Sequence, residues 1–178
     1  MATSSASIAY IGIIGRNNNP LHTTILSPIR TPLQFSLLLS STIDIFEMRA
    51  RSSAAPPSSS SAAVTPNLTG ELGLLHAVDD RLAAYGFETN TGVRFVVVVD
   101  VRAGEDGTRS GVGLRDADVR PVFKALQAAY IALLQNPFYD PDEHTPPHGQ
   151  GGKKITSRNF SAEVRRIGEK WHPGVTVI

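Results

Sequence analysis

The segment at residues 93–101 reads VRFVVVVDV, and it constrains the fold more than any other stretch of the chain. Its four consecutive valines lack the polar-apolar alternation of a strand that has one face in water. β-branched side chains favour strands, and the turn-forming run Asn90-Thr91-Gly92 comes directly before this segment. We therefore predict a central strand at residues 93–101, in a sheet that is covered on both faces.

Strand-like and helix-like segments flank this strand in an order that indicates an α+β fold. Turn-forming residues separate the strand-like segments, and apolar residues recur at helical spacing in three others. The order ββαβββαα predicts a largely antiparallel sheet with helices on both faces. The expected strands are residues 7–15, 21–26, 70–78, 81–89 and 93–101, and the expected helices are residues 33–49, about 119–134 and a last one from about Ser157.

The second expected helix carries recognisable signals at both ends. Pro121 is best tolerated in the first turn of a helix, where its missing N–H costs no hydrogen bond. This position favours Asp118 as the N-cap residue over the alternative, Asp116. Asn136 and Pro137 are expected to end the helix.

Three polar segments interrupt the pattern and account for the length beyond one small domain. They are rich in Ser, Pro, Gly or charged residues and offer few large apolar side chains to offset the entropy of ordering. We expect a single domain at residues 7–171, a C-terminal tail at 172–178 and disordered insertions at 51–69, 102–113 and 140–154.

The composition excludes several classes of protein. The chain has no cysteine, which excludes a disulfide-stabilised scaffold, a thiolate zinc site and a thiol nucleophile. Its 17 Lys and Arg residues nearly balance 16 Asp and Glu residues, so we expect no nucleic-acid partner. We find no targeting signal, and no apolar run approaches the roughly 20 residues of a membrane-spanning helix. We expect a cytoplasmic protein with no transmembrane segment.

No segment carries a strong catalytic or cofactor-binding motif. Gly111 and Gly113 follow the valine-rich strand, as in a dinucleotide-binding loop, but Asp116 occupies the place of the third glycine. His144 and His148 are close enough in sequence to suggest a metal site, yet the prolines between them prevent the helix that would align them. We expect no catalytic residue, no metal and no cofactor.

Two apolar segments are instead candidates for contact with a protein partner. The helix at 33–49 has more large apolar residues than one core-facing stripe requires, which indicates an interface on its surface. Two aromatic residues follow the end of the second helix, where they either anchor the chain on the core or contact a partner. The expected partner-binding residues are Phe35, Leu39, Ile43, Phe46, Asn136, Pro137, Phe138 and Tyr139.

Several of these segments together resemble the sedlin family. The motifs that carry the resemblance are LGLL at 72–75, YGFETNT at 85–91, FVVVVD at 95–100 and NPFY at 136–139. Each motif is weak alone, but their shared order along the chain is specific. The chain departs from the family pattern in the three polar segments and in the C-terminal tail.

The resemblance implies a longin-like (SNARE-like) fold, in which a five-stranded antiparallel sheet lies between one helix and a pair of helices. It further implies a non-catalytic adaptor subunit of the TRAPP vesicle-tethering complex, in transport between the endoplasmic reticulum and the Golgi and within the Golgi. The implied partners are other TRAPP subunits and, indirectly, a Rab GTPase on which the assembled complex exchanges nucleotide. The implied location is the cytoplasm, peripheral at these membranes.

Two other functions remain open at this stage. Another longin-like trafficking adaptor, such as a SNARE regulatory domain or a coat small chain, would share the predicted fold. A small α+β nucleotide-binding enzyme would instead use Gly111, Gly113 and Asp100.

Overall fold

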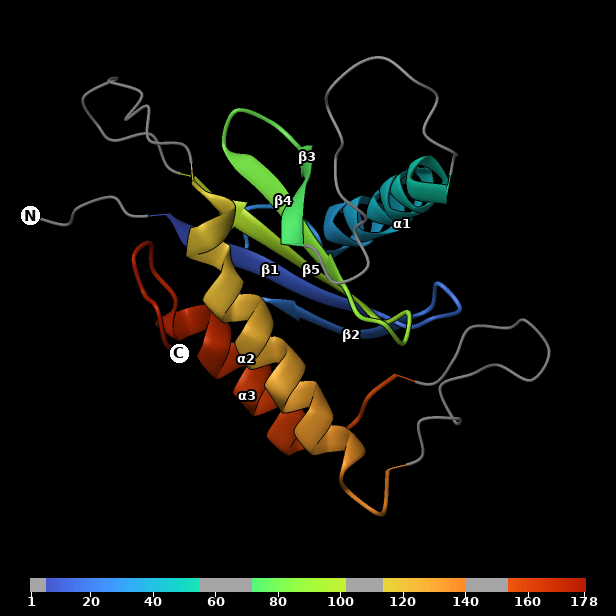
Figure 1. Cartoon of the computed structure of the whole chain (residues 1–178). Helices are drawn as coiled ribbons and strands as arrows, with labels where there is room; N and C mark the ends of the chain where they lie inside the picture. Colours follow the sequence, from blue (N-terminus) through green and yellow to red (C-terminus); the bar gives the residue numbers. More distant parts are fainter. Residues whose placement is uncertain (1–5, 55–71, 102–113, 140–153) are drawn as a thin grey trace, which may run out of the picture.

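The computed structural model describes residues 6–54, 72–101, 114–139 and 154–178 (Figure 1). Within these segments, five strands and three helices follow the predicted order ββαβββαα, which is thereby confirmed. The strands are β1 (Ser7–Ile14), β2 (Pro20–Ile25), β3 (Leu72–Ala77), β4 (Leu82–Glu88) and β5 (Arg94–Asp100), and the helices are α1 (Pro32–Ala54), α2 (Asp116–Leu134) and α3 (Arg158–Lys170).

The strands form one antiparallel sheet in the order β2-β1-β5-β4-β3. β5 is the central strand, because it pairs with β1 on one side and with β4 on the other. α1 covers one face of the sheet, and α2 and α3 lie side by side on the other face (Figure 1). The predicted α+β arrangement, with one helix on one face and two on the other, is confirmed.

The side chains of β5 explain why both faces of the sheet need a cover. Phe95, Val97 and Val99 belong to the core beneath α2 and α3, whereas Val96 and Val98 belong to the core beneath α1. All five side chains are completely buried. Because alternate residues of a strand point to opposite faces, a strand that is buried on both sides is apolar throughout. The predicted central strand is confirmed.

α1 packs closely against β1. The rings of Tyr10 and Phe35 are stacked, with their centroids 4.8 Å apart and their planes 3° apart. Gly12 lets Leu39 approach the strand, since a Cβ atom at residue 12 would lie 2.5 Å from a methyl carbon of Leu39. These contacts determine which side of α1 faces the sheet.

α3 packs against the opposite face of the sheet from α1, through the side that the spacing of its apolar residues predicted. Ser157 is its N-cap residue, and the Ser157 Oγ accepts a hydrogen bond from the Phe160 N–H at 3.4 Å. The indole N–H of Trp171 donates to the carbonyl oxygen of Asp118 at 2.9 Å, which ties the end of α3 to the start of α2. The buried side chains of this segment are Phe160, Val164, Ile167 and Trp171.

The predicted N-cap of α2 is wrong. The N-cap residue is Arg115, so Asp116 and Asp118 both lie inside the first turn. The carboxylate of Asp118 accepts a hydrogen bond from the backbone N–H of Arg115 at 3.0 Å, and this bond supports the earlier start. Pro121 consequently lies inside the helix, where it leaves one backbone carbonyl without its usual intrahelical donor.

Two of the predicted insertions overlap residues that the structure describes. Residues 51–54 were expected to be disordered but continue α1, and an ion pair between Glu47 and Arg51 at 3.5 Å supports this last turn. At the end of the third expected insertion, Lys154 lies in the described part of the chain. The next residue, Ile155, donates its N–H to the carbonyl oxygen of Leu21 in β2 at 2.8 Å. Residues 55–69, 102–113 and 140–153 lie outside the described residues.

Candidate partner-binding surfaces

Most of the partner-binding residues predicted on α1 face the sheet instead. Phe35 is completely buried, Leu39 and Phe46 are 4% and 3% exposed, and Ile43 is partly buried. The first three side chains therefore have almost no surface to offer a partner, which corrects their predicted role. They are apolar because they form the core between α1 and the sheet.

The exposed apolar residues of α1 are different ones. Leu33, Leu37 and Met48 have 68%, 62% and 57% of their surface exposed. Their spacings of 4 and 11 residues place them on one side of the helix, together with the exposed Ser41 and Asp44. We call Leu33, Leu37, Ser41, Asp44 and Met48 the outer stripe of α1. The spacing of apolar residues in the sequence did not identify the outer stripe. α1 carries apolar residues on both sides, and their spacing does not show which side faces the sheet.

A polar network holds the C-terminal half of α1 against the sheet. Asn18, in the β1–β2 turn, adopts a left-handed conformation with φ of 60°. Its Nδ2 donates to the Glu47 carboxylate at 3.0 Å, and its Oδ1 accepts from the Arg94 guanidinium at 2.6 Å. The same guanidinium lies 5.3 Å from the centroid of the Phe46 ring. These contacts orient the outer stripe of α1. The residues that make them lie far apart in the sequence, so no local motif indicated the network.

The segment from Asn136 to Tyr139 forms a turn after α2, and its two aromatic residues have different roles. Within the turn, Asn136 accepts the Tyr139 N–H at its carbonyl oxygen at 3.0 Å and the Phe138 N–H at its Oδ1 at 3.1 Å. Tyr139 packs against the core, and burial raises the pKa of its hydroxyl above the ordinary value. Phe138 is 95% exposed. Tyr139 is therefore the anchor, and Phe138 is the side chain available to a partner.

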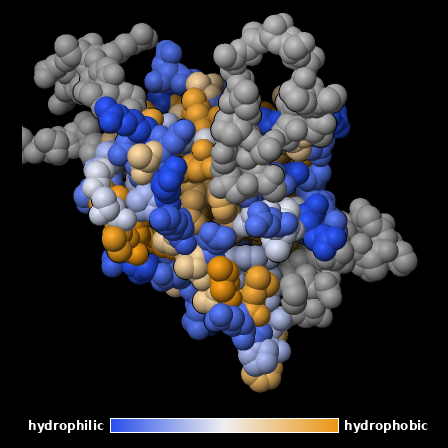
Figure 2. Space-filling view, in the orientation of Figure 1, coloured by the Kyte–Doolittle hydropathy of each residue, from blue (hydrophilic) through white to orange (hydrophobic). Residues whose placement is uncertain are grey.

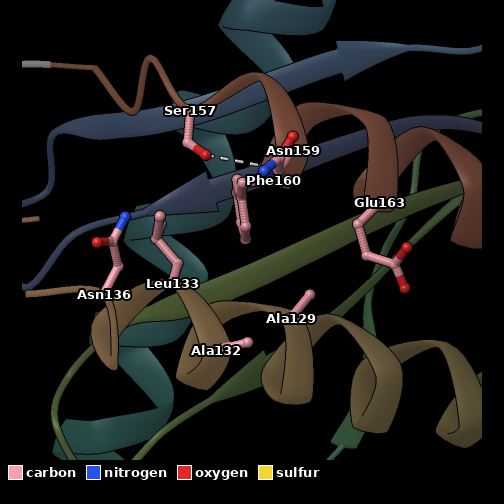
Figure 3. Close-up of a pocket in the computed structure, with 8 residues that line it drawn as sticks. All are labelled: Ala129, Ala132, Leu133, Asn136, Ser157, Asn159, Phe160 and Glu163. Carbon is pink, nitrogen blue, oxygen red and sulfur yellow. Dashed lines mark hydrogen bonds between the residues drawn. The ribbon is translucent and has the colours of Figure 1, made fainter. Parts of the chain in front are cut away.

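A hollow of about 220 Å³ lies beside this turn, between α2 and α3 (Figure 3). Phe160 points from α3 toward α2, while Asn136 and Ser157 lie at one end of the hollow and Glu163 lies at the other (Figure 3). We call it the α2–α3 hollow, and it is lined by Ala129, Ala132, Leu133, Asn136, Ser157, Asn159, Phe160 and Glu163.

The described lining of the α2–α3 hollow contains no acid–base pair. Among the lining residues that the structure describes, Glu163 is the one titratable side chain. Arg166 donates two hydrogen bonds to this carboxylate, at 2.8 and 2.5 Å, and holds the pKa of Glu163 below its usual value. A carboxylate held in this way is a poor proton acceptor at neutral pH.

Apolar side chains also gather outside the hollow, over the C-terminal half of α2 (Figure 2). The exposed large apolar residues of this part of the helix are Ile131 and Leu134, at 46% and 40% exposure. No helix in the described part of the chain is both long and apolar enough to cross a membrane.

The alternative catalytic candidates gain no support from the described residues. Asp100 is completely buried and accepts two hydrogen bonds from Arg81, at 2.6 and 2.9 Å, at the end of the central strand. The described residues contain no group of three or more His, Asp or Glu side chains that could hold a metal ion. The remaining candidates, Gly111, Gly113, His144 and His148, lie outside the described residues.

Comparison with known proteins identifies the family. The Sedlin family model matches residues 13–170, from the end of β1 through the whole of α3. The chain is similar to the trafficking protein particle complex subunit 2-like proteins of several organisms. It is 29% identical to the Mus musculus protein over 154 residues, which cover 86% of this chain and 91% of that protein.

Proteins of the same name from two other organisms match the chain to a similar extent. The Taeniopygia guttata protein is 29% identical over 157 residues, which cover 88% of this chain and 94% of that protein. The Dictyostelium discoideum protein is 28% identical over 163 residues, which cover 90% of this chain and 95% of that protein. The sheet and the three helices have the longin-like arrangement that the resemblance implied. By its sequence and its fold, this chain belongs to the sedlin family.

Proposed function

We propose that this chain is a non-catalytic adaptor subunit of the TRAPP vesicle-tethering complex, in transport between the endoplasmic reticulum and the Golgi and within the Golgi. The names of its relatives, subunit 2-like proteins of the trafficking protein particle complex, support this role. The chain joins other TRAPP subunits and helps to assemble the complex that exchanges nucleotide on a Rab GTPase. It acts in the cytoplasm, peripheral at these membranes.

The outer stripe of α1 is the observation that carries the proposal. The helix has already buried one side against the sheet, yet Leu33, Leu37 and Met48 remain exposed on the opposite side. Keeping large apolar side chains in water is unfavourable, and an extended exposed set of them is typical of a surface that a partner covers. A small domain with such a surface buries these apolar side chains against a partner subunit in an assembly.

The polar sites support binding rather than chemistry. The carboxylates of Glu163 and Asp100 are each held by two hydrogen bonds from an arginine side chain. The arginine beside Glu163 lowers the pKa of this carboxylate, which is therefore not poised to take up a proton at neutral pH. An adaptor needs surface shape and complementary charge, and it needs no activated group.

We propose that residues 7–171 act as one domain, with insertions at 55–69, 102–113 and 140–153 and a tail at 172–178. The two cores on either side of the sheet share β5, and the Trp171 indole closes the body against the start of α2. These contacts support one domain because neither core can form without the central strand.

Affinity purification of the tagged full chain from its native cells tests this function. We expect TRAPP subunits to co-purify with the wild-type chain. We expect Leu37→Asp to lower their recovery about tenfold or more, because it places a charge in the outer stripe. Ser36→Asp is the matched control, since Ser36 is exposed on the same helix outside the stripe. Recovery of the wild-type chain as a free monomer, without TRAPP subunits, would overturn the proposal.

A further inference from the structure

Four hydroxyl side chains of this chain are followed directly by a proline, and they belong to Ser27, Thr31, Thr65 and Thr145. A hydroxyl residue followed by proline is the substrate of the proline-directed class of protein kinases. Proline fixes its own φ and biases the residue before it toward an extended backbone, which is the form in which a kinase binds a substrate segment. Thr65 and Thr145 lie outside the described residues, so the structure compares Ser27 with Thr31.

Thr31 is the more accessible of these two residues. It is exposed directly before α1, whereas Ser27 is only partly exposed and follows β2. The Ser27 N–H donates to the carbonyl oxygen of Ala9 in β1 at 3.1 Å, which ties the backbone of Ser27 to the sheet. A kinase has to break this contact to extend the segment around Ser27. Thr31 has no hydrogen bond to the sheet among the described residues, and it is therefore the better substrate.

The hydrogen bonds of Thr31 leave its hydroxyl proton available. Its Oγ1 accepts the Gln34 N–H at 3.3 Å, and its own N–H donates to the Gln34 Oε1 at 3.0 Å. These reciprocal bonds form a capping box at the start of α1. Because the Oγ1 acts as an acceptor, its own proton can pass to a base. Pro32 has no N–H, and the N–H of Leu33 has no acceptor among the described residues.

A phosphate on Thr31 suits this end of α1. Its oxygens can accept the N–H groups of Leu33 and Gln34, which lie in the first turn of the helix. Its negative charge is favourable at the positive end of the helix dipole. We therefore expect the modified chain to keep its fold, with a thermal midpoint equal to or above that of the unmodified chain.

The same phosphate would lie against the N-terminal end of the outer stripe of α1. A phosphate oxygen that accepts the Leu33 N–H lies about 3 Å from that nitrogen, and helical side chains lean toward the N-terminus of their helix. The exposed Leu33 side chain therefore leans toward the phosphate. The neighbouring cation, Arg30, already forms an ion pair with Asp79, so much of the added charge stays unbalanced. Negative charge at an apolar contact opposes binding, because the charge must lose its water when a partner covers it.

We propose that Thr31 is a phosphorylation site of a proline-directed protein kinase, and that its phosphate releases the TRAPP subunit that covers the outer stripe of α1. The Thr31 Oγ1 attacks the γ-phosphorus of ATP, and the new O–P bond forms as the bond from this phosphorus to the ADP oxygen breaks. ADP leaves, and the hydroxyl proton passes to a base of the kinase. The effect on binding rests on the proposed function, whereas the modification itself does not.

Mass spectrometry of the tagged full chain, purified from its native cells with phosphatase inhibitors, tests the modification. We expect phosphothreonine at residue 31, with an occupancy about tenfold or more higher in the free chain than in the chain that co-purifies with TRAPP subunits. Pro32→Ala keeps the Thr31 hydroxyl but removes the dipeptide, so it should lower the occupancy severalfold. Pro28→Ala is the matched control and should leave it unchanged. Absence of phosphate at residue 31, or an occupancy that Pro32→Ala leaves unchanged, overturns the proposal.

Two isosteric variants test the effect of the charge on binding. Asp and Asn are both good N-cap residues, so Thr31→Asp and Thr31→Asn keep the start of α1 and differ by one charge. We expect Thr31→Asp to lower the recovery of TRAPP subunits about threefold or more relative to Thr31→Asn, with a thermal midpoint that is no lower. Ser27→Asp and Ser27→Asn are the matched control pair, since Ser27 lies in the loop before α1 and outside the outer stripe, and they should give equal recoveries.

The outcomes separate this inference from the proposed function. Failure to recover any TRAPP subunit with either the wild-type chain or Thr31→Asn overturns the proposed function and, with it, the effect on binding, while the mass spectrometry still decides whether Thr31 is modified. If the complex is recovered, equal recoveries with Thr31→Asp and Thr31→Asn overturn the inference alone. A lower thermal midpoint for Thr31→Asp does the same, because the lost binding then comes from a damaged helix.

Discussion

The face of the sheet beneath α1 is covered by one helix, whereas the opposite face is covered by two helices that also pack on each other. A single helix buries one of its sides, so the other side of α1 remains in water with Leu33, Leu37 and Met48. In the α2–α3 pair, apolar side chains converge between the helices and the sheet and leave a hollow outside. One face thus presents a helical stripe and the other presents a pocket.

The contacts between aromatic rings are also unequal, with more of them on the face beneath α2 and α3 than on the face beneath α1. Beneath α1, the rings of Tyr10 and Phe35 form one stacked pair. Beneath α2 and α3, Phe95 contacts both Phe87 and Tyr130, and further ring contacts continue to α3. We infer that the two-helix face is held together by more shared contacts, and that damage there costs more stability.

Truncating one completely buried ring on each face tests this difference and should give the largest effects. We expect Phe35→Ala and Phe95→Ala each to lower the free energy of unfolding by about 3–5 kcal/mol, through lost burial and the cavity left behind. Phe95→Ala should lie at the upper end, because its ring contacts two others. Urea unfolding with matched m-values measures both. A larger loss for Phe35→Ala would reverse the ranking of the two faces.

A methyl group added to a glycine on each face should give the opposite ranking, because its cost depends on the atoms next to that glycine and not on the ring contacts of the face. A Cβ atom at Gly86 would collide with the Leu75 side chain and would lie 2.6 Å from the rigid Phe46 ring, so we expect Gly86→Ala to cost about 1–3 kcal/mol. In α3, a Cβ atom at Gly168 would lie 2.2 Å from the end of the flexible Leu26 side chain, which can move aside, and 3.2 Å from the Cδ1 of Ile11. Against these contacts, Gly168→Ala gains about 1 kcal/mol of helix propensity. Its net effect should be close to zero in the same urea assay. Equal losses for both variants would contradict this contrast.

The sequence predicted the fold well where burial leaves a periodic pattern. The unbroken apolar run of β5 indicated a strand covered on both faces, and the spacing of Phe160, Val164 and Ile167 indicated the buried side of α3. In both segments, the positions of the apolar residues follow directly from which sides of the element are buried. The start of α2 was missed because a hydrogen bond from the Arg115 N–H to Asp118 supports a poor N-cap residue.

The candidate surfaces were harder to predict for a different physical reason. Apolar residues occupy both sides of α1, so composition indicated an interface but selected Phe35, Leu39 and Phe46, which the structure buries. The hollow depends on small side chains of α2 meeting Phe160 of α3. Such a juxtaposition of distant segments follows from the packed fold and leaves no local motif.

The N-cap of α3 allows a smaller perturbation that is confined to the two-helix face. We expect Ser157→Ala to lower the free energy of unfolding by about 1 kcal/mol, because it removes the acceptor of the Phe160 N–H. Thr156→Ala is the matched control, since Thr156 is exposed and directly precedes the cap. Its effect should stay within about 0.5 kcal/mol. Thermal unfolding monitored by circular dichroism distinguishes the two, and equal losses would contradict the role of the cap.

The smallest expected effect is a pH dependence that belongs to the two-helix face. His22 lies in β2 with its ring edge-on to Phe160 and 2.8 Å from the Thr24 hydroxyl, and burial lowers the pKa of its imidazole. The unfolded chain, with an ordinary histidine pKa of about 6.5, therefore binds this proton more readily than the folded chain. The neutral side chain contributes stability above about pH 6.5, and this contribution is lost as the pH falls toward the lowered pKa.

Replacing His22 by Gln isolates this contribution, because the amide keeps a hydrogen-bonding group near Thr24 but does not titrate in this range. We expect the wild-type chain to lose more stability than His22→Gln between pH 7.5 and pH 5.5, with the midpoint of thermal unfolding as the measurement. His76→Gln is the matched control, since His76 is exposed on β3 at the far edge of the sheet. Its pH dependence should follow that of the wild-type chain. If His22→Gln behaves in the same way as His76→Gln, the packing of α3 on β2 does not depend on the charge of His22.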